Sequence, residues 1–222
     1  PSYFTPAGYT FSIWGLIYTA LLGYTIYQLL PAQRQAPFQA KIGWLFVATS
    51  VFNSAWLLAW HYAYYAVSIV MMVALLVTLI AIFRRLRVGR PGRDVDWKTR
   101  LFVEIPFSIY LGWITVATIA NVSSVANFWG GGGFGIAEPV WSAIMMATAV
   151  LVAAWVLYNR VALSYAAVLI WALFGIRAAY PDVAVVANTA VIAAILIAAI
   201  ALIGAWRSRQ QEPATSARTR TA

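Results

Sequence analysis

Long apolar segments alternate with short polar connections along almost the whole chain. An α-helix of about 20 apolar residues, rising about 1.5 Å per residue, spans the roughly 30 Å hydrocarbon core of a bilayer. The pattern therefore predicts an all-α fold, a polytopic transmembrane helix bundle with seven spans. The predicted spans cover approximately residues 9–30, 42–61, 64–83, 101–122, 139–158, 161–179 and 183–206.

Basic residues occupy only alternate connections between these segments. Fourteen of the 15 Lys and Arg residues fall on one side of the predicted bundle, and only Arg177 falls on the other. Removing one internal span would mix the two sides, so the charge pattern also supports the number of spans. Because basic loops remain in the cytoplasm, the sequence predicts residue 1 outside the cell and the C-terminus in the cytoplasm.

The composition agrees with a protein embedded in lipid and excludes several functional classes. Of the 222 residues, 63% are hydrophobic and only 9% are charged, whereas a soluble domain has about 25% charged residues. The net charge of +9 comes from connections that flank the membrane, so the bilayer, and no nucleic acid, is the predicted partner. With no Cys and a single His, the sequence offers neither a disulfide nor a Cys- or His-rich metal site.

The last predicted span and the residues after it differ in character. Small residues recur at steps of three and four in the span, which predicts close packing against another helix. These residues are Ala187, Ala190, Ala194, Ala198, Ala201 and Ala205. Residues 207–222 are polar and basic and lack apolar periodicity, which predicts a disordered cytoplasmic tail.

Few polar side chains lie inside the predicted spans. Glu104 is one turn inside the arginine-rich connection and is expected to pair with an arginine. Glu138 is expected at the start of a helix, where the helix dipole favours a negative charge. No span contains a pair of carboxylates, and no Ser-His-Asp set or metal cluster occurs, so neither catalytic residues nor metal ligands are predicted.

Three sets of aromatic, small and amide residues recur at helical spacing, so each set lies on one helix face. They are Trp14 and Tyr18 in the first span, Asn53 and Trp56 in the second, and Trp113, Ala117 and Asn121 in the fourth. The predicted orientation places all three faces in the outer half of the membrane. Aromatic walls with a few amide groups suit a flat, largely apolar ligand. Ordinary aromatic packing with amide hydrogen bonds between helices is the alternative interpretation.

These faces resemble three motifs of the TspO/MBR family, the tryptophan-rich sensory proteins. The segment Ile13-Trp14-Gly15 with Tyr18 is similar to the family's Ile-Trp-Gly-x-x-Tyr helix. Asn53-Ser-Ala-Trp56 looks like its Asn-x-x-Trp motif, and the segment from Trp113 through Ala117 to Asn121 looks like its Trp-x3-Ala-x3-Asn motif. The order and spacing of the three motifs agree with the family over roughly residues 3–123.

The resemblance implies a bundle that binds porphyrins and other flat hydrophobic molecules between its helices. Trp56, Trp113, Ala117 and Asn121 would line the pocket, and Trp14, Tyr18 and Asn53 would support it. It also implies a receptor with a sensory or regulatory role in tetrapyrrole handling. A bound porphyrin or haem is the one cofactor candidate, a homodimer is left open, and a bacterial cytoplasmic (inner) membrane is the expected location.

The chain departs from the family pattern in three ways. The family's first helix would lie upstream of Pro1, which would give eight spans in a complete protein. Trp56-Leu57-Leu58 replaces the family's Trp-Pro-Pro, and three further spans follow. The predicted organisation is therefore a TspO-like region at 1–123, three additional helices at 124–206 and the tail at 207–222.

Three other functions remain open from the sequence. The additional spans are compatible with a small-molecule transporter, and the alanine stripe with an accessory subunit of a membrane complex. An enzyme that degrades porphyrin in light would need only tryptophans near the ligand. No acid–base pair supports an enzyme, and the resemblance makes a TspO-like receptor for flat hydrophobic ligands the leading hypothesis.

Overall fold

Seven long α-helices and one short α-helix form most of the part of the chain that the computed structural model describes. Short 3-10 and π-helical turns lie between some of them. Its backbone covers residues 2–130, 135–158 and 160–218, and its side chains are described within these ranges up to residue 210. The helices are α1 (Ile13–Leu29), α2 (Pro37–His61), α3 (Tyr65–Leu86), α4 (Trp97–Thr99), α5 (Ile105–Phe128), α6 (Glu138–Tyr158), α7 (Leu163–Ala179) and α8 (Ala184–Arg218). Each predicted apolar segment contains one long helix, which confirms the all-α bundle.

Two of the long helices are shorter than the other five. The spans α2, α3, Trp97–Phe128, α6 and the first 27 residues of α8 are long and apolar enough to cross a membrane by length and composition. Helices α1 and α7 have 17 residues each, close to the lower limit of about 17 for a spanning helix. A 3-10 helix, Gly8–Ser12, precedes α1, and the N–H of Ala7 beside it donates to the Gly175 carbonyl of α7 at 3.0 Å.

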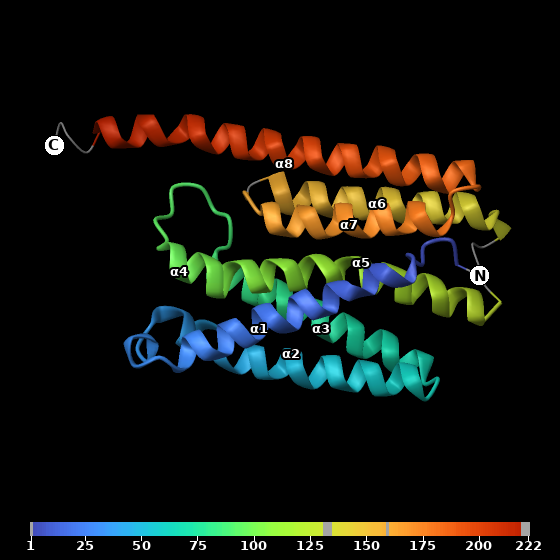
Figure 1. Ribbon diagram of the computed structural model, residues 1–222, viewed down its shortest axis with the longest axis horizontal. Helices are drawn as coiled ribbons and strands as arrows, with labels where there is room; N and C mark the ends of the chain where they lie inside the picture. The colour runs from blue at the N-terminus through green and yellow to red at the C-terminus, as the bar shows by residue number, and fades with distance from the viewer. Residues whose placement is uncertain (1, 131–134, 159, 219–222) are drawn as a thin grey trace.

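Helix α5 lies at the centre of the bundle, between α1, α2 and α3 on one side and α6, α7 and α8 on the other (Figure 1). It packs on α1 and α3 and also on α7, so it joins the two groups of helices. In the span Trp97–Phe128, 67% of the most apolar 18-residue stretch is buried, against 17–39% in the other four spans. Residues on α5 are therefore the ones that both groups of helices share.

Consecutive long helices run in opposite directions, so alternate connections gather at the same end of the bundle. The α1–α2, α3–α5 and α6–α7 connections and the C-terminal end of α8 lie at one end, and residue 2 lies at the other (Figure 1). All the connections predicted to be basic are at the first end. The arrangement therefore agrees with the charge alternation predicted from the sequence.

Small residues allow the helices around α5 and α8 to approach closely. A Cβ atom added at Gly112 of α5 would lie 3.0 Å from the backbone oxygen of Tyr165 and 3.1 Å from the Cβ atom of Val168, both on α7. Four members of the alanine stripe of α8 are buried, and α8 packs on α6 and α7, as predicted. Contact between helix backbones thus replaces large interdigitating side chains at these crossings.

One arginine joins the end of α3 to the start of the α5 span. Arg93 Nη1 donates to the carbonyl oxygens of Leu86 and Arg87, which α3 itself leaves free at its C-terminus. Arg93 Nη2 lies 2.7 Å from Oε1 of Glu104, the last residue of a π-helical turn, Arg100–Glu104, that leads into α5. The predicted pairing of Glu104 with an arginine is confirmed, and Arg93 is its partner.

The C-terminal helix is longer than the apolar pattern predicts. The backbone of α8 is helical as far as Arg218, which differs from the disorder predicted for residues 207–222. The Arg, Gln and Ala residues of this stretch have high helix propensity, whereas Pro213 opposes a helix. Of the predicted tail, residues 219–222 lie outside the described part of the chain.

Candidate functional site

Trp14 of α1 is the centre of an aromatic cluster between α1, α2 and α5. It stacks on Tyr18, with ring centroids 5.3 Å apart and planes 24° apart, and on Trp56 of α2, at 6.5 Å and 25°. The edge of a second indole meets it from α5, where Trp113 lies 6.4 Å away at 82°. The three predicted helix faces therefore meet, and four of the seven predicted residues are in direct ring contact.

Two further rings complete the cluster and were not among the predicted residues. Tyr110 lies 6.0 Å from Trp14 at 69°, and Phe11 lies 5.7 Å from Trp113 at 84°, both in edge-to-face geometry. Tyr110 precedes Trp113 by three residues, so helical spacing would have placed both on one face. Phe11 belongs to the 3-10 helix before α1, where the pattern of an α-helix does not apply.

Asn53 connects α2 to α1 at the edge of the cluster. Its Nδ2 atom donates to the Tyr18 hydroxyl oxygen at 3.3 Å. The carbonyl oxygen of the same amide is buried and has no hydrogen-bond partner among the described residues. The amide thus holds Tyr18 in place and leaves one acceptor free beside the rings.

Asn121 and Ala117 lie farther along α5 and are not part of the ring cluster. Ala117 follows Trp113 by four residues, or about 6 Å along the helix axis. Asn121 follows it by eight residues, or about 12 Å. Ala117 is half-buried against the core. Asn121 is buried, and its carbonyl oxygen accepts a hydrogen bond from Ser68 Oγ of α3 at 3.4 Å. The structure therefore directs Asn121 toward α3, where sequence reasoning had grouped it with the tryptophans.

Several donors of the predicted site are buried without a partner among the described residues. These atoms are Nε1 of Trp56, Nε1 of Trp113 and Nδ2 of Asn121. An unsatisfied buried donor costs about 1–3 kcal/mol. Two of these donors, the indole N–H groups of Trp56 and Trp113, belong to rings that both contact Trp14.

Three cavities in the described part of the molecule have linings that include none of the seven predicted residues. Their volumes are about 1050, 390 and 500 Å³, and all three lie toward the basic end of the bundle. Tyr18 is 52% exposed and Trp56 is half-buried, so the aromatic cluster is open on its lipid-facing side.

The remaining polar candidates have structural roles. Glu138 is the first residue of α6, as predicted, and its Oε2 atom accepts a hydrogen bond from Asn127 Nδ2 at 3.2 Å. His61 is exposed at the end of α2. Within the described ranges, no three His, Cys, Asp or Glu side chains come together as a metal site would require.

Comparison with known families identifies the chain over most of its length. The family model described as TSPO-like protein matches residues 1–203. The searches of curated proteins and of solved structures give no match. The matched region continues past residue 123, where the motif resemblance ends, through α6 and α7 and into α8. The division of the chain at residue 123 stays a prediction.

The family match and the five long apolar helices agree with each other. Together they make the chain an integral membrane protein whose helices contact the lipid bilayer. It belongs to the family of TSPO-like proteins.

Proposed function

We propose that this TSPO-like protein is a membrane receptor for flat, largely apolar ligands of the tetrapyrrole class, with a sensory or regulatory role. The observation that carries the proposal is the pair of buried indole N–H groups of Trp56 and Trp113, which lack an acceptor among the described residues. Both rings contact Trp14. The aromatic surface and the free donors therefore occur at one place.

The chemistry of this cluster matches that of a porphyrin. The macrocycle is flat and apolar and stacks on aromatic rings, and its carboxylate substituents accept hydrogen bonds from donors such as indole N–H groups. Asn53 Oδ1 offers an acceptor at the edge of the same cluster. Tyr18, which is exposed and stacked on Trp14, offers a further ring on the lipid-facing side. In this proposal binding uses stacking, burial and hydrogen bonds, without an axial metal ligand from the protein.

Replacing Trp56 and Trp113 together with alanine is expected to weaken protoporphyrin IX binding by at least about tenfold, which corresponds to about 1.4 kcal/mol. Truncating one buried and one half-buried ring removes both their contact area and their donors. The measurement is a titration of the purified protein in detergent, followed through the absorbance band of the porphyrin, because that band is the same for every variant.

The matched control is the double variant Trp44→Ala with Trp206→Ala. These tryptophans are 87% and 60% exposed and lie outside the aromatic cluster, so the affinity should remain that of the native protein. Saturable binding that is equal in the native protein and the Trp56, Trp113 variant would reject the site. An absence of saturable binding to the native protein would reject the ligand class.

We also propose that the protein resides in a bacterial cytoplasmic membrane with its basic end in the cytoplasm. The support is the gathering of the basic connections at one end of the bundle (Figure 1). Because the chain has no cysteine, a single introduced thiol reports its own side. A membrane-impermeant maleimide should label Tyr64→Cys, at the α2–α3 turn, in intact cells. It should label Trp97→Cys only after permeabilisation; the reverse pattern would invert the topology.

A further inference from the structure

The largest of the three cavities, about 1050 Å³, lies at the basic end of the bundle between α3, α5, α6 and α8. Four arginines line it: Arg84 from α3, Arg90 from the α3–α4 connection, Arg160 from the α6–α7 connection and Arg207 from α8. None of the described residues in its lining is acidic. The one ion pair found among the described side chains, Arg93 with Glu104, uses none of these four arginines.

Backbone contacts fix two of the arginine-bearing connections to each other. The N–H of Val161 donates to the Gly89 carbonyl at 2.6 Å, and Arg160 Nη1 donates to the Val88 carbonyl at 3.0 Å. Gly89 has a φ of +65°, and a Cβ atom there would lie 2.5 Å from the Val161 oxygen, so only glycine fits this crossing. Arg90 and Arg160 are therefore held beside the same cavity by the fold.

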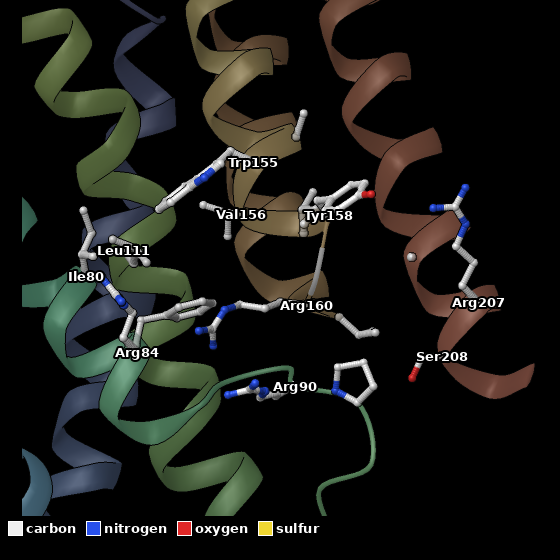
Figure 2. A pocket seen from close by; sticks show the side chains of 16 residues that line it. Ile80, Arg84, Arg90, Leu111, Trp155, Val156, Tyr158, Arg160, Arg207 and Ser208 are labelled. Atoms are coloured by element: carbon white, nitrogen blue, oxygen red, sulfur yellow. The ribbon is translucent and has the colours of Figure 1, made fainter. Parts of the chain in front are cut away.

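Three of the guanidinium groups converge within the cavity. Figure 2 shows Arg84, Arg90 and Arg160 directed toward one region, whereas Arg207 lies apart from them on α8. The Arg160 guanidinium lies over the Phe83 ring, 5.2 Å from its centroid. Burial lowers the pKa of Arg160, and the neighbouring charges of Arg90 and Arg84 lower this pKa further. Clustered like charges that no carboxylate offsets are stabilised by a bound anion.

Most of the rest of the lining is apolar, and part of it is exposed on the surface of α6. Ile80, Leu111 and Val156 belong to the walls. Trp155 and Tyr158, also in the lining, are 71% and 73% exposed on α6 (Figure 2). A polar end that favours anions and an apolar side that faces the membrane match an amphiphile with an anionic head.

We propose that this cavity binds the phosphate group of an anionic amphiphile, with Arg84, Arg90 and Arg160 on the phosphate and the α5 and α6 walls on the acyl chain. Arginine is suited to this task because its planar fork donates two parallel hydrogen bonds to phosphate oxygens. The proposal does not depend on the aromatic cluster, which uses other residues. The phosphate could be supplied by a lipid headgroup or by a soluble phosphate compound, and the test distinguishes these sources.

The test is a thermal-stability titration of the purified full chain in neutral detergent with three probes. They are dioctanoyl phosphatidylglycerol, dioctanoyl phosphatidylcholine and inorganic phosphate. The phosphatidylglycerol should raise the melting temperature in a saturable manner, and the other two should have a much smaller effect at equal concentration. If inorganic phosphate has an equal effect, the cavity binds a soluble phosphate and the proposal of an amphiphilic ligand is wrong. If phosphatidylcholine has an equal effect, the cavity does not recognise an anionic ligand and the proposal is also wrong.

The double variant Arg84→Gln with Arg160→Gln should weaken the phosphatidylglycerol effect by at least about tenfold. The matched control is Arg34→Gln with Arg87→Gln, which removes the same charge at the same end but from residues outside the three cavities. If both double variants lose affinity equally, general surface charge explains the binding and the site is rejected. Arg90→Gln, on an exposed connection, provides a second test should the first variant fail to fold, and unchanged affinity in it would also count against the site.

Discussion

Replacing Arg93 with methionine is expected to lower the free energy of unfolding by about 3–5 kcal/mol. Glu104 is only 6% exposed, and Arg93 Nη2, at 2.7 Å, is its counterion. Removing that cation leaves the buried carboxylate with only the charge of Arg100 to offset it. It also removes the hydrogen bonds that the Leu86 and Arg87 carbonyl oxygens accept from Arg93, and Arg87 keeps its bond from the Arg90 N–H. Equilibrium unfolding in detergent micelles with increasing sodium dodecyl sulfate, followed by circular dichroism, measures the loss.

A second substitution separates charge from packing in this prediction. Glu104→Gln added to Arg93→Met removes the buried charge, so the double variant should recover most of the stability lost by the single variant. Arg34→Met, which changes an exposed arginine at the same end of the bundle, should change stability by less than about 0.5 kcal/mol. A double variant no more stable than Arg93→Met would mean that the ion pair is not the source of the effect.

Replacing Gly112 with leucine is expected to cost about 3 kcal/mol or more, because it forces α5 and α7 apart. Even a Cβ atom at this position would be 3.0 Å from the Tyr165 backbone oxygen. A backbone oxygen inside a helix cannot rotate away as the tip of a side chain can. The same unfolding titration measures the change, and the variant should also unfold over a broader range because α5 joins the two groups of helices.

Gly43→Leu in α2 is the control for the Gly112 variant. A Cβ atom at Gly43 would have no neighbour within 4 Å, and leucine has a higher helix propensity than glycine by up to about 1 kcal/mol. This variant is expected to be as stable as the native protein or slightly more so. Equal destabilisation by the two substitutions would show that the α5–α7 crossing is not a point of close packing.

The helices were predictable because the membrane thickness sets the length of each apolar segment, and each segment is contiguous in the sequence. The charge alternation added their relative directions, and helical spacing brought Trp14, Trp56 and Trp113 onto faces that meet. These inferences depend on periodicity within one helix and on the side of each loop. Neither requires knowledge of how far apart two helices lie.

Features that depend on distances between helices were not predictable in this way. Helical spacing places Asn121 on the face of Trp113, yet the hydrogen bond with Ser68 shows that α3 approaches this part of α5. The arginine cavity is lined by Arg84, Arg90, Arg160 and Arg207, which come from four separate segments. From the sequence alone, these arginines indicated only which side of the membrane each connection lies on. No nearby residues in the sequence indicate that Val161 contacts Gly89.

The contact of Trp14 with two other indoles, at 6.5 Å from Trp56 and 6.4 Å from Trp113, has an optical consequence. Rings this close exchange electronic excitation, so the three indoles emit as one coupled unit and cannot serve as independent reporters. A molecule that quenches the outermost ring would darken all three. Time-resolved emission anisotropy should therefore show a fast depolarising component from the cluster, in addition to the slower decay of the remote, lipid-facing tryptophans.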